Sequence, residues 1–254
     1  VGFLVLFPFF LLFEQKNVKK ELINNQNFFF KYSLLIGLFL FLGSALQQIS
    51  LQYTDIANAA FFTIFYVPMV PIIIFIFNRK SIHWSVWPSV FLCVIGGYLL
   101  TNFQDATVRL GDTLVLLGAL FWSTHIIFTG IMVTKYNLPL TVGATQTLIV
   151  SLFSFIIGSI YEEFIFKNIL NEIYSILYAG ILSGGIAFVL QIYAQRNITP
   201  APAAIIFSLE GVFATIAAWF LLNQILNINN LLGCFFILCG VLLSQLLPLI
   251  KKKA

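Results

Sequence analysis

One carboxylate, Glu210, stands within the long apolar run "AIIFSLEGVFATIAAWF" (204–220). A charge at the centre of a membrane-spanning helix costs roughly 2.5–3.5 kcal/mol on insertion scales, so it must face a cavity, a partner or its own proton. Functionally, such an acid either exchanges a proton or binds the amine of a ligand. The structural alternative is a neutral glutamic acid that hydrogen-bonds a neighbouring helix and serves packing only.

A second candidate is His125, in the apolar stretch "FWSTHIIF" (121–128). Imidazole gains and loses a proton near neutral pH, so His125 either binds substrate, shares a proton with Glu210, or stays neutral and bonds a facing helix. Trp122 lies three residues earlier and therefore on the same helix face. Its ring either stacks on an aromatic or cationic ligand or packs in lipid or core.

Glutamines form a further pattern within the apolar runs. Gln48 and Gln52 lie one helical turn apart, and so do Gln191 and Gln195. Side chains at this spacing share a face and line a cavity or join helices by hydrogen bonds. Weaker candidates of the same kind, in the run 57–77, are Asn58 and Tyr66.

The composition shows what surrounds these polar residues. Of the 254 residues, 60% are hydrophobic and only 9% are charged, whereas a soluble domain has about a quarter charged. The chain therefore lacks the polar side chains to cover a surface in water, and lipid must surround it. The net charge of +4 comes from sparse basic residues between apolar runs, which excludes a nucleic-acid footprint. Three cysteines without metal-ligand spacing give no expectation of a metal or cofactor.

Runs of about 20 apolar residues predict membrane helices. We expect them at 31–52, 57–77, 84–103, 110–132, 139–161, 173–194, 201–222 and 228–248, joined by short polar connections such as "EQKNVKKELINNQN" (14–27). The apolar run 1–13 is too short to span, and we interpret it as the remainder of a truncated helix.

The basic residues orient these spans. Placing the lysine tail in the cytoplasm puts eleven of the thirteen Lys and Arg residues on that side and leaves only Arg109 and Lys167 outside. The excess of Lys and Arg in short loops marks the cytoplasmic face. Most acids then face outward: Asp55, Asp105, Asp112, Glu162, Glu163 and Glu172.

The sequence also shows an internal similarity between its two halves. A shift of 143 residues places the segment 34–100 on 177–243 without a gap, pairing Gln48 with Gln191 and Gln52 with Gln195. The shift covers an odd number of spans, so the two copies enter the membrane in opposite directions. Inverted repeats are typical of alternating-access transporters, whose substrate sites lie near the midplane. In this alignment Glu210 falls opposite Val67, which breaks the symmetry.

Several segments carry a family resemblance. They are "GDTLVLLGALFWSTHIIFT" (111–129), "YAQRNITPAPAAIIFSLEGVFATIAAWFLLNQ" (193–224), "LLGCFFILCGVLLS" (231–244), "LQYTDIANAAFFTIFYVPMVPIII" (51–74) and "VIGGYLL" (94–100). In these the chain resembles the EamA-type transporters of the drug/metabolite transporter superfamily. The resemblance implies an all-α polytopic membrane protein of two inverted five-helix repeats. The repeats would be 1–103 and 110–250, with ten spans in the intact protein, about nine here and the N-terminal helix missing.

The resemblance also implies a function: secondary transport, often export, of a small metabolite such as an amino acid, an amine or a drug-like solute. The setting would be a bacterial inner membrane, with the C-terminus cytoplasmic and protons as a candidate coupling ion. The substrate-binding candidates are Glu210, His125, Trp122, Gln48, Gln191, Asn58 and Tyr66. The chain departs from the family pattern where Gly211 follows Glu210 in place of proline, and where Asn223-Gln224 replace a glycine and an acidic residue.

Two other functions are the alternatives. One is a membrane-embedded enzyme, which the absence of HExxH and GxSxG motifs and of paired intramembrane acids disfavours, so no catalytic residue is expected. The other is a passive channel, for which a repeated pore-lining filter would be more typical. No GxxxxGK[ST] loop is present, so the energy is expected to come from an ion gradient or from solute exchange. The sequence does not indicate an oligomeric state.

Overall fold

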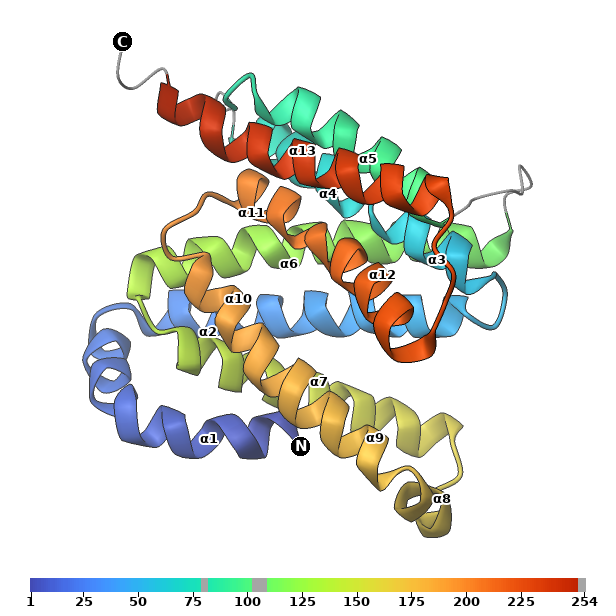
Figure 1. Cartoon of the computed structure of the whole chain (residues 1–254). Coiled ribbons are helices and arrows are strands. Elements are labelled where there is room, and N and C mark those ends of the chain that lie inside the picture. The colour runs from blue at the N-terminus through green and yellow to red at the C-terminus, as the bar shows by residue number, and fades with distance from the viewer. Residues whose placement is uncertain (79–81, 102–108, 251–254) are drawn as a thin grey trace. The chain divides into compact units, whose positions relative to one another are not determined.

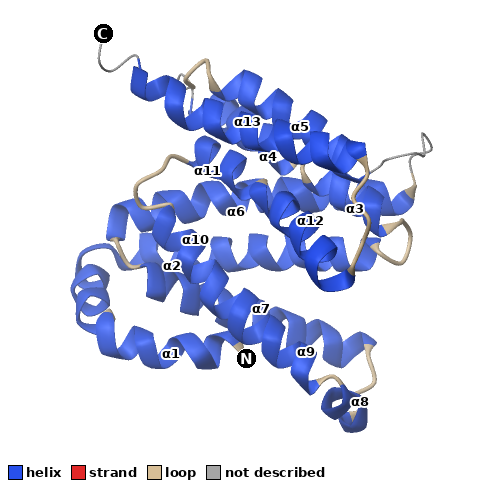
Figure 2. Ribbon diagram, in the orientation of Figure 1, coloured by secondary structure: helices blue, strands red, loops and turns tan. Residues whose placement is uncertain are grey.

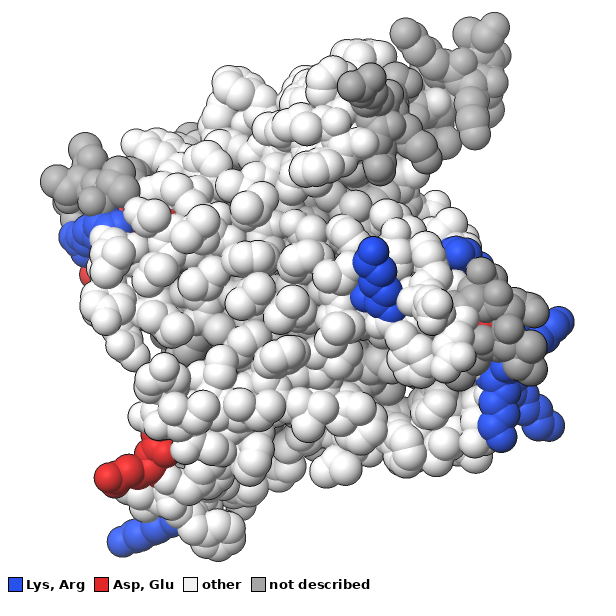
Figure 3. Space-filling model, turned by 180° about the vertical axis from the view of Figure 1, so that it is seen from behind, with Lys and Arg blue, Asp and Glu red and all other residues white. Residues whose placement is uncertain are grey.

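The computed structural model describes residues 1–78, 82–101 and 109–250, and within these ranges every regular element is a helix (Figure 2). Seven segments of the described chain are long and apolar enough to cross a membrane: Gln26–Ser50, Ile56–Phe77, Leu110–Tyr136, Pro139–Tyr161, Ile173–Ala194, Pro200–Leu221 and Ile228–Pro248. Two apolar helices, Gly2–Phe13 and Val86–Thr101, are shorter. The predicted all-α polytopic membrane protein is confirmed, with seven full-length candidates where about nine spans were expected. Most of the face in Figure 3 is correspondingly uncharged.

The predicted polar connection at 14–27 is helical for nearly all of its length, and the membrane-span candidate of this helix begins only at Gln26. Helix α2 runs without interruption from Gln15 to Ser50. About half of its polar first part is Lys, Gln, Glu and Leu, which have high helix propensity, so charge alone does not end the helix. Its 36 residues correspond to about 54 Å, well beyond the roughly 30 Å of a hydrocarbon core.

Contacts within the chain divide it into two compact units. Unit 1 comprises residues 1–41 and 128–198, and unit 2 comprises residues 42–127 and 199–254. Each unit therefore combines chain from both predicted repeats. The predicted positions Arg79, Lys80, Asp105 and 251–253 lie outside the described residues.

Unit 1 is built on the first part of α2 and the end of α6 (Leu110–Tyr136). Its other elements are α1 (Gly2–Phe13), α7 (Pro139–Tyr161), α8 (Phe166–Asn171), α9 (Ile173–Tyr178), the π-helix η1 (Ala179–Ala187) and α10 (Phe188–Ala194). Its core joins α2, α6, α7 and α10 through Val18, Phe29, Ile36, Met132, Val133, Tyr136, Leu138, Val142 and Ile192. Helix α1 packs against α7 and η1, and Gly2 approaches the backbone of Gly180 and Gly184 in η1.

A buried carboxylate fixes the start of α7 within unit 1. Glu14 is 8% exposed. Its Oε1 accepts the Leu140 N–H at 3.1 Å, and its Oε2 accepts the Thr141 N–H at 2.7 Å and the Thr141 hydroxyl at 2.6 Å. These N–H groups belong to the first turn of α7, where the helix leaves them without partners of its own. The acid caps a helix distant in sequence and ties the α1–α2 junction to it.

Unit 2 contains the end of α2, the first part of α6 and six further helices. These are α3 (Ile56–Thr63), α4 (Tyr66–Asn78), α5 (Val86–Thr101), α11 (Pro200–Phe207), α12 (Leu209–Leu222) and α13 (Ile228–Ile250), while α6 spans Leu110–Tyr136. Helix α5 lies along α13 (Figure 1), and the two backbones approach closely at Gly96 and Gly233. Small residues allow such contact between membrane helices, where packing replaces the hydrophobic driving force.

Two apolar spans of unit 2 are interrupted near their middles. The span 56–77 breaks at Ile64-Phe65, between α3 and α4, and the span 200–221 breaks at Ser208, between α11 and α12. Pro68 explains the first break: it has no N–H for the Ile64 carbonyl, which accepts the Val67 N–H at 2.9 Å instead. At the second, Gly211 stands in the proline's place, and its N–H bonds the Ser208 carbonyl at 3.3 Å.

The second break therefore occurs without proline. The Ser208 hydroxyl donates to the Ile205 carbonyl at 2.6 Å, a local bond that competes with regular helix geometry. Glycine at 211 adds a weak helix former. The two breaks lie at positions related by the same shift of 143 residues that aligns the predicted repeats.

The α5–α13 crossing allows a stability test. A Cβ at Gly233 would lie 2.7 Å from the Gly96 carbonyl oxygen and 2.8 Å from the Leu100 nitrogen, so Gly233→Ala must separate two backbones. We expect a loss of about 1–3 kcal/mol, measured as a lower melting temperature of the purified protein in detergent. Gly158→Ala is the matched control, because its Cβ would meet only the Glu162 Oε2 at 3.8 Å. Equal melting temperatures for both variants would contradict the close crossing.

Candidate functional site

Unit 2 has an open-sided cavity of about 810 Å³, within the size range of small-molecule sites. Helices α3 and α12 supply most of its walls. The end of α2, the end of α5, the start of α13 and the segment 224–226 complete it. Its polar lining residues are Gln47, Thr63, Thr101, Ser208, Glu210, Thr215, Gln224 and Asn230.

Glu210 is the one ionisable side chain among the described residues that line this cavity. It lies in the first turn of α12, directly after the break at Ser208. The positive end of the helix dipole favours a negative charge at that position. No hydrogen bond or ion pair joins the carboxylate to another described side chain, and the residue is exposed to the cavity. The acid is thus available to a ligand or a proton.

Tyr66, at the start of α4, lies near this acid. Its side chain is only 4% exposed, and its hydroxyl has no hydrogen-bond partner among the described residues. Glu210 and Cys93 both act on it electrostatically. The Cys93 thiol in turn lies 3.5 Å from the Ser208 hydroxyl at the helix break. The two interrupted spans therefore bring their polar residues together near Glu210.

Neutral side chains complete the cavity wall, and hydrogen bonds to neighbouring helices position Gln47 and Asn230. The Gln47 amide donates to the Thr63 hydroxyl at 3.2 Å, which joins α2 to α3. Asn227 and Asn230 exchange backbone-to-side-chain bonds at 3.1 and 2.9 Å, a reciprocal cap at the start of α13. Asn230 also donates to the Leu100 carbonyl at 3.1 Å, at the end of α5.

The end of α12 is set by Asn223, which stands where the family pattern has glycine. Its φ of 51° and ψ of 31° are left-handed, a conformation that asparagine tolerates better than most residues. The Gln224 N–H then bonds the Ala218 carbonyl at 3.2 Å and closes the helix. This turn places Gln224 on the cavity wall.

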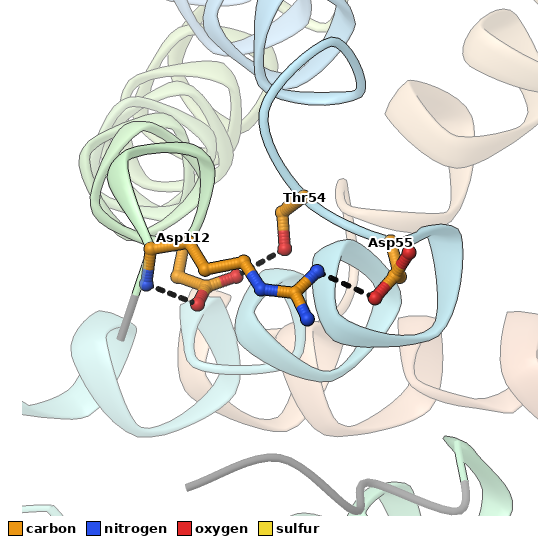
Figure 4. Close-up of polar contacts among 4 residues, drawn as sticks. Thr54, Asp55 and Asp112 are labelled. Carbon is orange, nitrogen blue, oxygen red and sulfur yellow. Dashed lines mark hydrogen bonds and ion pairs between the residues drawn. The ribbon is translucent and has the colours of Figure 1, made fainter. Parts of the chain in front are cut away.

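A separate polar cluster holds the start of α3 (Figure 4). The Arg109 guanidinium pairs with the Asp55 carboxylate at 2.6 Å, and the Thr54 hydroxyl donates to Asp112 Oδ1 at 2.5 Å. Asp112 is fully buried in the first turn of α6, and its Oδ2 accepts the Arg109 N–H at 2.9 Å. The cluster ties the start of α6 to the turn before α3, which forms one wall of the cavity.

The structure brings only one of the seven predicted binding residues into the cavity lining, namely Glu210. In unit 2, His125 is fully buried and Trp122 half-buried, with ring centroids 6.0 Å apart. Asn58 is 5% exposed, and its Nδ2 has no hydrogen-bond partner in the described chain. Gln48 is exposed, and Gln191 is a half-buried residue of unit 1.

Sequence reasoning missed Gln47, Thr63, Thr215, Gln224 and Asn230. Repeat symmetry predicts that Gln48 and Gln191 line the cavity, but the neighbouring Gln47 is the glutamine on its wall. No group of three His, Cys, Asp or Glu residues in the described ranges is placed to share a metal ion.

Comparison with known proteins assigns the chain to a family. The model of the EamA-like transporter family matches residues 109–246. An "uncharacterized transporter" of Archaeoglobus fulgidus is 30% identical over 223 residues, which are 85% of this chain and 69% of that protein. The chain belongs to the EamA-like transporter family. The confirmed assignment makes it a transporter of the drug/metabolite transporter type, as the resemblance implied.

Two further similarities fit this family. The "uncharacterized transporter YoaV" of Bacillus subtilis is 25% identical over 146 residues, 55% of this chain and 48% of that protein. A solved crystal structure of a 14% identical protein superposes with a TM-score of 0.78 over 97% of this chain and 84% of the other. At that identity the superposition supports the fold alone.

The cavity predicts which positions a polar reagent reaches. Ala214 lines the cavity, whereas Ala204 is fully buried. In a background lacking Cys93, Cys234 and Cys239, we expect Ala214→Cys to react in detergent with a hydrophilic maleimide at least about tenfold faster than Ala204→Cys. The rates are followed by mass spectrometry. Equal rates, or protection of position 214, would show that the cavity is closed to water.

Proposed function

We propose that this EamA-like transporter is a secondary active transporter of a small solute, which binds beside Glu210 in the unit 2 cavity. The observation that carries the proposal is one unpaired acid, at a helix break within a membrane span, on the wall of a ligand-sized cavity. A buried polar group inside the membrane is costly, so an intramembrane acid facing a cavity favours a role in binding or proton exchange.

Alternating access between inverted repeats is part of the proposal, with repeats 1–103 and 110–250. The two interrupted spans support it, because their breaks are related by the repeat shift. Their halves are also used differently: α4 packs against α11, whereas α3 and α12 line the cavity. In the alternate state, the repeat relation predicts the reverse, with α3 against α12 and a cavity between α4 and α11.

Charge distribution orients the proposed transporter. With the C-terminus in the cytoplasm of a bacterial cell, as the excess of basic residues in the inner loops favours, the spans 57–77 and 84–103 place Ile56 and Thr101 toward the outside. Gln224 and Asn230 lie on the same side. The cavity would then open outward, and export would require the opposite state to load the solute.

The remaining candidates keep a secondary place in the proposal. His125, Trp122, Asn58 and Tyr66 belong to unit 2, and Tyr66 interacts with Glu210. Gln48 of unit 2 and Gln191 of unit 1 do not line this cavity and stay predictions. Coupling to protons would run through Glu210, because a carboxyl that alternately holds a proton and a solute links the two movements.

Counterflow in proteoliposomes tests the transport proposal. Vesicles loaded with unlabelled tyramine, putrescine, tyrosine or leucine should accumulate the same labelled compound from outside for at least one probe. Glu210→Gln should reduce that exchange at least about tenfold, since the amide keeps the shape but loses the charge. Glu163→Gln, at an exposed loop acid, is the matched control and should retain it. No probe exchanging above protein-free vesicles would contradict the function.

The orientation has its own test. In the cysteine-free background, Ile225→Cys, which is 94% exposed beside the cavity, should react with an impermeant maleimide added to intact cells. Thr134→Cys, exposed at the other end of its span beside Lys135, should react only after permeabilisation. The opposite pattern would place the C-terminus outside.

A further inference from the structure

We propose that the unit 2 cavity selects an organic monocation, an amine with an apolar or aromatic body, and rejects solutes that carry a carboxylate. The inference rests on the proposed function, because it takes the unit 2 cavity as the solute site. It concerns solute binding alone, so it can be tested separately from transport. Its basis is the direction in which the lining groups donate their hydrogen bonds.

The hydroxyl groups on the cavity wall have their protons committed to the backbone of their own helices. Thr63 donates to the Ala59 carbonyl at 2.8 Å, and Ser208 donates to the Ile205 carbonyl at 2.6 Å. Thr215 donates to the Gly211 carbonyl at 2.8 Å, and Thr101 to the Gly97 carbonyl at 3.0 Å. A hydroxyl has one proton and two lone pairs. These four groups therefore offer acceptors to a ligand.

The amides next to them are biased in the same direction. The Gln47 Nε2 is engaged by the Thr63 hydroxyl at 3.2 Å, and its carbonyl oxygen makes no bond with the described chain. The Asn230 Nδ2 donates one N–H to the Leu100 carbonyl at 3.1 Å, and its Oδ1 accepts the Asn227 N–H at 3.1 Å. Gln224 is the one lining amide without a hydrogen bond that fixes its side chain in the described part of the chain. With the Glu210 carboxylate and the hydroxyl oxygens, the wall offers more acceptor lone pairs than N–H donors.

The charge of the wall agrees with this bias. Glu210 contributes a negative charge, and no Lys, Arg or His is among the described lining residues. Arg109 reaches the start of α3, but its guanidinium is already paired with Asp55 at 2.6 Å. A solute carboxylate would meet another carboxylate, with no cation to offset its loss of water, and such burial is strongly unfavourable.

An ammonium group, in contrast to a carboxylate, suits both the charge and the hydrogen-bond acceptors of the wall. It carries a positive charge and only donors, so it pairs with Glu210 while its remaining N–H groups meet a wall that offers mostly acceptors. The rest of the wall is small and apolar: Ala57, Ala60, Gly211, Ala214 and Ala218. In about 810 Å³ these side chains leave room for a ring or an aliphatic chain. The cavity thus fits a cationic head and an apolar body.

Matched pairs of compounds test the selectivity. The purified full chain in detergent is given tritiated tyramine in a scintillation proximity assay, with phenethylamine, tyrosine, phenylalanine and the amine-free 4-ethylphenol as competitors. Phenethylamine should displace tyramine, whereas tyrosine, phenylalanine and 4-ethylphenol should need at least about tenfold higher concentrations. A tenfold difference corresponds to the loss of one charge-assisted contact.

Two variants and a control locate the effect. Glu210→Gln should weaken tyramine binding at least about tenfold, and Thr215→Val, which removes an acceptor while keeping the shape, should weaken it about threefold or more. Glu163→Gln should bind as the unchanged chain does. Melting temperatures within a few degrees of one another confirm that each variant is folded.

The outcomes separate this inference from the transport proposal. Tyrosine competing as well as phenethylamine, unaltered tyramine binding in Glu210→Gln, or no tyramine binding at all would overturn the inference. Counterflow of tyrosine or leucine alone would overturn it while leaving transport intact. Selective tyramine binding without counterflow of any probe would uphold the cation site and contradict transport.

Discussion

The cost of a carboxylate at membrane depth is the constraint on which the organisation of unit 2 depends. In lipid, both the acid and any interrupted backbone must find polar partners, and both requirements meet at Ser208 and Glu210. The break supplies a helix N-terminus whose dipole favours the charge, and the cavity provides space for a ligand. An uninterrupted apolar helix would offer neither.

The same constraint explains how the surrounding helices are held. Because lipid tails compete with apolar side chains, close helix contact depends on shape and on hydrogen bonds. The α5–α13 crossing uses glycines at 96 and 233, whereas the ends of these helices use the Asn230 bond to the Leu100 carbonyl. At the start of α3, the hydrogen bonds of Asp112 and the Arg109–Asp55 ion pair likewise join neighbouring segments. Polar contacts therefore hold helix ends around the cavity, and glycines beside them allow the α5 and α13 backbones to approach closely.

The fold was largely predictable because apolar run length is a direct consequence of bilayer thickness. The seven full-length segments lie close to predicted spans, and Glu210 could be singled out because a lone acid in such a run has few explanations. The polar connection at 14–27 was predictable but its helical structure was not, because polar residues with high helix propensity continue a helix beyond the membrane. The break at Ser208 was not predictable from a proline, because Gly211 stands at the position equivalent to Pro68.

The neutral part of the site was less predictable for a different reason. Gln47 and Gln48 are adjacent in sequence but lie about 100° apart around a helix, and only packing decides which one meets the cavity. The repeat pattern favoured Gln48, whereas the wall contains Gln47. Asn230 and Gln224 lie in a capping motif and a helix-ending turn, features that hydropathy does not report.

The asymmetry of the two interrupted spans has a consequence for any alternating mechanism. The repeat shift places Glu210 opposite Val67, Thr215 opposite Ile72, and Ala218 opposite Phe75. Within the proposed mechanism, a cavity between α4 and α11 would be lined on the α4 side by apolar groups, so both states must use the polar groups at the second break. Glu210 stands at that break, in the middle of its span, and is within reach of either half. A single acid at the hinge between two half-helices can therefore serve both states, and a symmetric pair is not needed.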